Sequence, residues 1–304
     1  MKILLLGATG QVGWELQRSL APLGDVTACG RARADLSDLE GLRAAVRAVK
    51  ADVVVNAAAY TAVDKAESET ALATGINATA VGLLAEETKR TNAVLVHYST
   101  DYIFDGKKVG AYVETDAANP LSHYGRSKYE GEEAIRAVGG RHLILRTSWV
   151  YAPRGKNFPT TILNLAKARE QLTIVADQIG APTSAELIAD VTAQLLPRLG
   201  PADDLLGTYH LTAAGETSWH AYARLLVQLA AAKGYALKTA PERVLPIATA
   251  DFPTPAKRIA NSRLATDKLR AAFGLTLPLW DAPLGRFLEE LPHAELPHEG
   301  SHTP

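Results

Sequence analysis

The sequence has almost no cysteine and almost no net charge. Its single cysteine, Cys29, excludes an internal disulfide, and a chain without disulfides is typical of a reducing compartment. The formal net charge of -1 gives no electrostatic basis for nucleic acid or an anionic membrane surface as the main partner. We therefore expect neither nucleic acid nor a membrane among the partners of this protein.

Long apolar runs, targeting signals and repeats are lacking as well. The opening MKILLLGATG is apolar but reaches Gly7 too early for a signal peptide and has no small-residue cleavage site. No stretch is long enough to cross a bilayer. The 304 residues are 47% hydrophobic, which is ample for a large core. These features predict a cytoplasmic protein with one large α/β domain or two lobes.

What is present is an alternation of short apolar runs with helical stretches. The runs are KILLL (2–6), DVTAC (25–29), ADVVVNAAA (51–59), NAVLVHYST (92–100) and RHLILRTSWV (141–150). Strands alternating with helices predict βαβ units, and hence an α/β fold with a Rossmann-like doubly wound parallel sheet over residues 1–150. Proline is more frequent after residue 150, where we expect a smaller, partly interleaved substrate lobe over 151–292. The aperiodic tail 293–304 is predicted to be disordered.

A glycine triplet opens the chain. In GATGQVG, Gly7, Gly10 and Gly13 lie directly after the first predicted strand and at the start of the first predicted helix. Glycines at this place allow a tight turn and let a pyrophosphate approach the backbone N–H groups of the helix N-terminus. Because a strand precedes the triplet and a helix follows it, dinucleotide binding is favoured over a packing turn. Residues 1–150 are thus predicted to form an NAD(P)-binding domain.

Arginine follows the second predicted strand. GRARADL places Arg31 and Arg33 where an acidic residue would bind the ribose 2′-hydroxyl of NAD. Arginine at this place accommodates the 2′-phosphate of NADP. The sequence therefore predicts NADPH, with NADH as the alternative. In the other interpretation these arginines belong to a solvated loop, and Asp35 contacts the adenine side.

Tyr124 and Lys128 are four residues apart in YGRSK. On a helix they share one face, and a nearby ammonium lowers the pKa of a phenol toward a value suited to a general acid. The alternative is a core aromatic with a solvated lysine. Ser99 and Thr100 end the fourth predicted strand, at the sheet edge where ligands bind, and a hydroxyl there can bind a substrate carbonyl. The order of these motifs along one chain favours catalysis.

Together, GATGQVG, NAAAYTAVDKAE, HYSTDYIFDG, NPLSHYGRSK and RTSWVYAPRGKNF resemble the extended short-chain dehydrogenase/reductase superfamily. Within it, the chain is similar to the dTDP-4-dehydrorhamnose reductase family from residue 1 to about residue 290, including DQIGAPT, TSWHAYA and FPTPAKRIANSRL. The resemblance implies NAD(P)H-dependent reduction of the C4 keto group of dTDP-4-dehydro-L-rhamnose, the last step of dTDP-rhamnose biosynthesis. The implied partner is a nucleotide-sugar substrate.

The resemblance also implies roles for single residues. Tyr124 is implied to be the proton donor, Lys128 to bind the nicotinamide ribose, and Thr100 to assist at the carbonyl. Asp101 and Trp149 are implied to line the sugar site. The implied cofactor contacts are Gly10, Gln11, Val12, Asp35, Leu36, Ala59 and Thr61, together with Tyr124 and Lys128.

Three cations lie close together in the proline-bounded segment after residue 250. Lys257, Arg258 and Arg263 are candidates to bind the substrate diphosphate, and we single out Arg258. Ordinary surface charge is the alternative.

Some members of the family are dimers bridged by a magnesium ion through carboxylates. The matching positions are Glu15, Glu186 and Glu290. Without the resemblance, isolated glutamates on helices would be read as solvated, although carboxylate oxygens do bind hard cations. A homodimer and Mg²⁺ are thus expectations from the resemblance alone.

Other functions within the superfamily fit some of the motifs. Sugar-nucleotide 4,6-dehydratases carry Asp-Glu after the threonine, whereas Thr100-Asp101 is followed here by Tyr102, which disfavours dehydration. A reductase or epimerase for another nucleotide-linked 4-keto-6-deoxyhexose stays open. So does a non-catalytic regulatory subunit of the methionine adenosyltransferase type, against which the presence of both Tyr124 and Lys128 argues.

Overall fold

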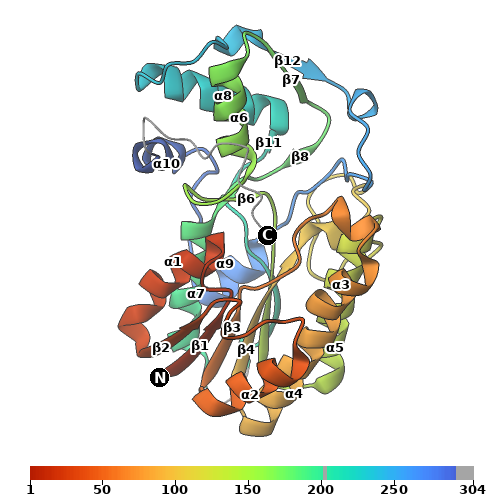
Figure 1. Ribbon diagram of the computed structural model, residues 1–304, viewed down its shortest axis with the longest axis vertical. Helices are drawn as coiled ribbons and strands as arrows, with labels where there is room; N and C mark the ends of the chain where they lie inside the picture. The colour runs from red at the N-terminus through yellow and green to blue at the C-terminus, as the bar shows by residue number, and fades with distance from the viewer. Residues whose placement is uncertain (201–203, 292–304) are drawn as a thin grey trace.

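The computed structural model describes residues 1–200 and 204–291; the tail predicted to be disordered lies outside them. A six-stranded parallel sheet forms the centre of the larger lobe (Figure 1). Its strands are β1 (Lys2–Leu6), β2 (Asp25–Cys29), β3 (Val53–Asn56), β4 (Val94–Thr100), β5 (His142–Thr147) and β10 (Gly207–His210), in the order β10-β5-β4-β3-β1-β2. The prediction of a Rossmann-like parallel sheet is confirmed.

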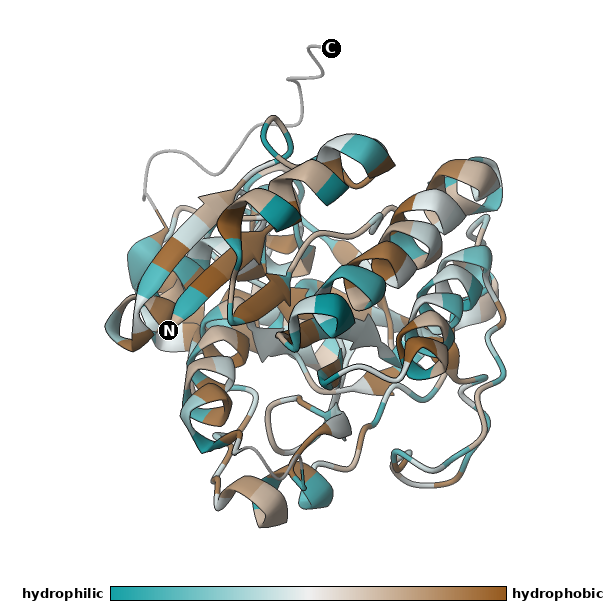
Figure 2. Cartoon of the chain, turned by 90° about the horizontal axis from the view of Figure 1, so that it is seen from below, coloured by the Kyte–Doolittle hydropathy of each residue, from teal (hydrophilic) through white to brown (hydrophobic). Residues whose placement is uncertain are grey.

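Helices cover both faces of this sheet, and Figure 2 shows the apolar strands between them. Ile3 and Leu5 pack toward α1 (Gln11–Leu20), α7 (Ala185–Leu195) and α9 (Asp267–Phe273). Leu4 and Leu6 pack toward α2 (Leu39–Val49), α4 (Ala80–Thr91) and α5 (His123–Val138). Because successive side chains of a strand point to opposite faces, burial of both faces explains the continuous apolar runs of the strands.

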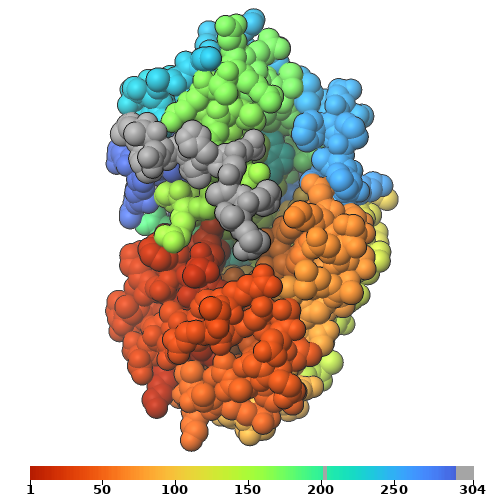
Figure 3. Space-filling model, viewed as in Figure 1, coloured from red at the N-terminus to blue at the C-terminus, as the bar shows by residue number. Residues whose placement is uncertain are grey.

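The second lobe has a core of its own. It is built from α6 (Phe158–Ala168), α8 (Trp219–Ala232) and α10 (Leu284–Glu290), with β7 (Leu172–Val175) paired to β12 (Val244–Ile247). Two short strand pairs join it to the sheet lobe: β6 (Val150–Tyr151) with β9 (Thr183–Ser184), and β8 (Ile179–Gly180) with β11 (Thr217–Ser218). Figure 3 shows the recess where this lobe, in green and blue, meets the red N-terminal part of the sheet lobe.

Short elements complete the described chain. A helix α3 (Thr70–Thr74) leads into a π-helical turn (Gly75–Thr79) before α4. The 3-10 turns are Ala21–Leu23, Lys65–Glu67, Asp101–Ile103, Leu196–Arg198, Pro241–Arg243 and Thr249–Asp251. Along the described residues, no helix is long and apolar enough to cross a membrane.

The two lobes interleave in sequence. The segment after residue 150 builds the second lobe, but it also supplies β10 at one edge of the sheet and α7 and α9 on one face. The strand order reverses between β1 and β3, and in such sheets ligands bind at the carboxyl ends of the strands beside the reversal. The second lobe lies over that edge (Figure 1).

Candidate active site

A cavity of about 970 Å³ opens at the carboxyl ends of the strands. Its wall is formed by the turns after β1, β2, β3, β4 and β5, by the start of α5, and by residues 147–157. The lining includes most residues predicted from the sequence: Gly7, Gly10, Gln11, Val12, Arg31, Asp35, Leu36, Ala59, Thr61, Thr100, Asp101, Tyr124, Lys128 and Trp149. Gly13 and Arg258 are not part of it. The fold thus brings together residues up to 142 positions apart, from Gly7 to Trp149.

The glycine turn after β1 is required by geometry. Gly7 has φ +75°, and a Cβ there would lie 2.6 Å from the backbone nitrogen of Ala58. A Cβ on Gly13 would lie 2.0 Å from the Gly7 carbonyl oxygen, so Gly13 serves the packing of α1 on the turn rather than the cavity wall. Gly10 is the N-cap of α1 and faces the cavity. This arrangement leaves the N-terminus of α1 accessible to a pyrophosphate.

Arg31 and Asp35 form an ion pair at the cavity wall. The Arg31 Nε lies 2.9 Å from an Asp35 oxygen, and 77% of the arginine side chain is exposed. Hydrogen bonds from the Ser37 backbone and from Arg31 lower the pKa of Asp35 to about 2. Arg33 does not line the cavity. A guanidinium whose orientation is fixed through Nε suits the recognition of a phosphate group.

Tyr124 is the second residue of α5 and is held in an apolar setting. Its ring packs edge-to-face on Tyr102, with ring centroids 5.6 Å apart. Burial raises the pKa of Tyr124 to about 12, and a hydrogen bond with Thr100 acts in the opposite direction. The expectation that Lys128 lowers the pKa of Tyr124 is therefore wrong, because desolvation of the phenol dominates. The phenol stays protonated at neutral pH, as a proton donor must.

Lys128 lies one turn further along α5 and is buried. Its Nζ donates to the Tyr98 carbonyl oxygen at 2.6 Å and lies 3.2 Å from Nε2 of His97. Burial lowers the pKa of Lys128 to about 8, although the nearby charge of Glu132 raises it. The solvated lysine of the alternative interpretation is thus wrong.

Asp101 is a buried carboxyl group without full pairing. One oxygen accepts from the Thr100 hydroxyl at 3.0 Å, whereas Oδ2 has no hydrogen-bond partner among the described residues. Burial raises the pKa of Asp101 to about 6, and a hydrogen bond with Ser262 opposes this. An unpaired buried oxygen in the wall of a cavity is suited to bind a ligand hydroxyl.

Trp149 lies in the cavity wall two residues after the end of β5. It has φ +51°, which is costly for a bulky residue and marks a constrained site. Its ring stacks on Trp219 of α8, with centroids 3.5 Å apart, so the second lobe fixes its orientation.

The loop before α6 carries cavity residues whose roles the motifs do not predict. Arg154, Lys156 and Asn157 all line the cavity. Asn157 caps α6 through a capping box and also donates to the Gln11 side chain at 2.8 Å. The Arg154 guanidinium lies 3.9 Å from the centroid of the Trp14 ring. The motif YAPRGKNF could have indicated a binding role for this loop, because two cations and an N-cap residue precede a predicted helix.

The comparison with known proteins agrees with this geometry. The family model for the RmlD substrate binding domain matches residues 1–292. A dTDP-4-dehydrorhamnose reductase of Burkholderia thailandensis is 50% identical over 96% of this chain and 99% of its own length. The corresponding protein of Escherichia coli K12 is 48% identical over 96% of this chain and 98% of its own. The chain belongs to the dTDP-4-dehydrorhamnose reductase family. The family membership expected from the motifs is confirmed.

A solved structure from this reductase family has the same fold. The dTDP-4-dehydrorhamnose reductase of Bacillus anthracis, in complex with NADP, has a TM-score of 0.87 at 33% identity. The match covers 95% of this chain and 99% of that one.

The structure places Arg258 outside the cavity wall of this dTDP-4-dehydrorhamnose reductase family member. Its guanidinium is 2.6 Å from Asp64, whose other oxygen accepts from the Ala256 backbone N–H at 3.1 Å. Burial raises the pKa of Tyr102, which lines the cavity, and the charge of Arg258 partly opposes this rise. Arg258 thus lies close behind the wall and joins the second lobe to the loop after β3.

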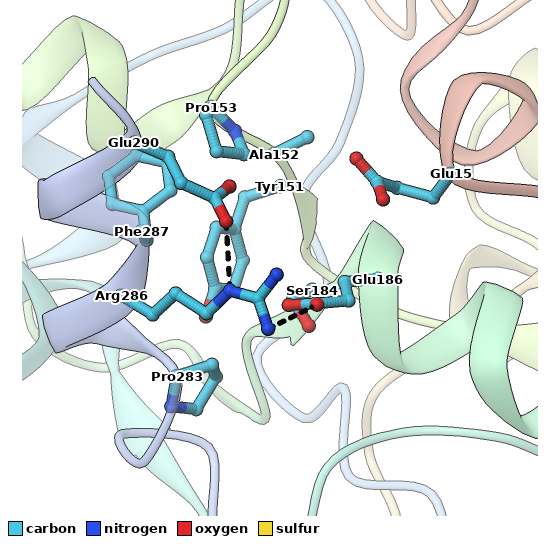
Figure 4. Close-up of a pocket in the computed structure, with 10 residues that line it drawn as sticks. All are labelled: Glu15, Tyr151, Ala152, Pro153, Ser184, Glu186, Pro283, Arg286, Phe287 and Glu290. Carbon is cyan, nitrogen blue, oxygen red and sulfur yellow. Dashed lines mark hydrogen bonds and ion pairs between the residues drawn. The ribbon is translucent and has the colours of Figure 1, made fainter. Parts of the chain in front are cut away.

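The three glutamates proposed for magnesium line a second, small cavity (Figure 4). Arg286 lies between two of them, 2.8 Å from Glu186 and 2.8 Å from Glu290, and Glu15 pairs with Arg18 at 3.5 Å. Among the residues that the structure describes, no group of three acidic, histidine or cysteine side chains could hold a metal ion. The carboxylates of one chain therefore do not fit a metal site, because the Arg286 guanidinium is already paired with two of them.

Proposed function

We propose that this protein reduces the C4 keto group of dTDP-4-dehydro-L-rhamnose with a reduced nicotinamide cofactor. The observation that carries the proposal is that Thr100, Tyr124 and Lys128 line the same cavity as the glycine turn after β1. A phenol, a hydroxyl and an ammonium beside a dinucleotide-binding turn can serve reduction of a carbonyl group.

Each of these groups has a defined part in the reaction. The cofactor, when bound, supplies the hydride. Tyr124 gives its proton to the oxygen that develops negative charge. Thr100, 5% exposed, turns its hydroxyl from Asp101 to donate to that oxygen. Lys128 holds the ribose and favours the tyrosinate left behind. Burial of Thr100 and Lys128 strengthens the electrostatic interactions that they make.

NADPH is the cofactor that the site favours over NADH. Arg31 lines the cavity and its guanidinium is held by Asp35, which suits a 2′-phosphate more than a 2′-hydroxyl. The resemblance between this chain and the Bacillus anthracis protein, solved with NADP, supports the same cofactor.

In this proposal, Trp149 and Asp101 position the sugar of the substrate. Trp149 offers an aromatic face to the sugar ring, and the unpaired Oδ2 of Asp101 can accept from a sugar hydroxyl. In the same proposal, residues 151–292 mainly form the substrate-binding lobe. Pairing with Asp64 weakens the case for Arg258 as a ligand of the substrate diphosphate.

Mg²⁺ takes no part in the proposed reaction, since a cation at Glu186 and Glu290 would have to displace Arg286. The homodimer implied by the resemblance stays a prediction.

The test is the loss of reduced-nicotinamide absorbance with dTDP-4-dehydro-L-rhamnose generated in situ by the preceding epimerase. NADPH and NADH are run in parallel, and the sugar product is analysed for its configuration at C4. We expect turnover with a preference for NADPH. Absence of oxidation with both cofactors would contradict the proposal and favour a non-catalytic role.

A further inference from the structure

His97 lies beneath the lysine of the active site and has no role in the function proposed above. It belongs to β4 and is 1% exposed. Its Nε2 lies 3.2 Å from Nζ of Lys128, and its Nδ1 lies 3.2 Å from Nδ2 of Asn56 at the end of β3. The buried polar chain Asn56, His97, Lys128 thus ends at the cavity.

The hydrogen-bond directions in this chain follow from its first member. The Asn56 Oδ1 accepts from the Ala58 backbone N–H at 3.2 Å, which leaves Nδ2 directed at the imidazole. An amide nitrogen only donates, so Nδ1 of His97 must accept, and a neutral imidazole then carries its proton on Nε2. His97 is neutral because burial and the charge of Lys128 hold its pKa well below the ordinary value.

The Nε2–H of His97 therefore faces Nζ of Lys128. An ammonium group is a donor only, whereas a neutral amine has a lone pair that accepts. We propose that His97, oriented by Asn56, is a positioning residue that presents an N–H to Lys128 and favours the neutral amine of the lysine over the ammonium. This proposal rests on the proposed function in one respect, namely that Lys128 takes part in the reaction.

Other groups around Lys128 also affect the equilibrium between its ammonium and its neutral amine. Glu132 on α5 favours the ammonium, but it is bound to Arg146 of β5 at 2.7 Å, which weakens its influence. Asp101 and Tyr124 share the cavity wall with Lys128. Burial also disfavours the ammonium and brings the pKa of Lys128 to about 8. The His97 N–H acts together with burial.

A lysine that readily loses its proton can reprotonate Tyr124, the general acid of the proposed reaction. After the substrate has taken the phenolic proton, the ammonium loses one proton and the tyrosinate of Tyr124 gains one. The lone pair left on Lys128 then accepts the His97 N–H, and solvent returns a proton to the lysine.

The direct test is the tautomer of His97. In protein labelled with ¹⁵N-histidine, the signals of this ring are assigned by their loss in His97→Gln. We expect the proton on Nε2 in the wild type. Asn56→Asp places a carboxylate, which only accepts, against Nδ1, so the proton should move to Nδ1. A proton on Nδ1 in the wild type would overturn the proposal, and this measurement needs no substrate.

The kinetic test is the pH profile of kcat with NADPH and the sugar nucleotide. In Asn56→Asp, Nε2 of His97 becomes an acceptor and favours the ammonium form of Lys128. The pH at which activity falls on the alkaline side should therefore shift upward by about one unit, which corresponds to the free energy of about one hydrogen bond. The matched control is Asn77→Asp, because Asn77 is equally buried and bonds Ser127 beside Lys128 but does not contact His97.

The two tests separate the possible failures. An unchanged profile in Asn56→Asp, or an equal shift in both variants, would overturn the proposal, since added charge alone would then explain the result. Absence of turnover in the wild type would contradict the proposed function, while the tautomer would still decide the role of His97.

Discussion

At the scale of single residues, the proposed chemistry depends most on the phenol of Tyr124. Tyr124→Phe keeps the ring packed on Tyr102 and removes only the proton source. We expect kcat to fall by about 10² to 10⁴. Cofactor binding should change much less, because the glycine turn after β1 is untouched. Steady-state kinetics and a fluorescence titration with NADPH measure the two effects. Near-normal turnover would show that another group delivers the proton.

Cofactor choice is a second property of one residue. Arg31→Ala removes a guanidinium from the cavity wall, so KM for NADPH should rise about tenfold, the effect of losing about 1.4 kcal/mol, while KM for NADH should change little. Arg33→Ala is the matched control, because Arg33 is two residues away and does not line the cavity. Equal effects on both cofactors would mean that Arg31 does not read the 2′-phosphate.

At the scale of elements, the loop before α6 joins helix capping to the cofactor site. Asn157→Ala removes the N-cap of α6 and the bond to Gln11. We expect a loss of about 1 kcal/mol in the free energy of unfolding together with a higher KM for the cofactor. Ser218→Ala is the control: it removes the N-cap of α8 outside the cavity wall. That variant should lose similar stability in urea titrations and keep the wild-type KM.

The strands of residues 1–150 could be predicted because each is an apolar run with local boundaries, and KILLL was found with its observed limits. The place of the glycine turn, Thr100 and Tyr124 in the cavity wall could be predicted as well, because each lies at the end of a predicted strand or the start of a predicted helix. The place of β10 beside β5 could not be predicted, since strand pairing over 60 residues leaves no local pattern. The pairing of Arg258 with Asp64 and the raised pKa of Tyr124 likewise depend on packing between distant segments.

At the scale of the whole molecule, buried histidines contribute to the loss of stability in acid. Burial lowers the pKa of His210 to about 3 and holds that of His97 well below its ordinary value. Both rings protonate below about pH 6.5 in the unfolded chain, so the unfolded state binds more protons there and stability falls as pH drops. Asp101, with its pKa raised to about 6, opposes this by taking up a proton in the folded state between about pH 6 and 4.

The contribution of His210 can be isolated. Its Nδ1 lies 3.1 Å from the Tyr112 carbonyl oxygen, and in His210→Asn the amide can donate to that carbonyl without titrating. Each neutral buried imidazole accounts for about 1.4 kcal/mol of lost stability per pH unit below 6.5. We therefore expect the free energy of unfolding of His210→Asn, measured by urea titration between pH 7.5 and 4.5, to fall less steeply with decreasing pH than that of the wild type. The difference between the two slopes below pH 6.5 should be about 1.4 kcal/mol per pH unit. A slope equal to that of the wild type would show that His210 is already protonated in the folded protein.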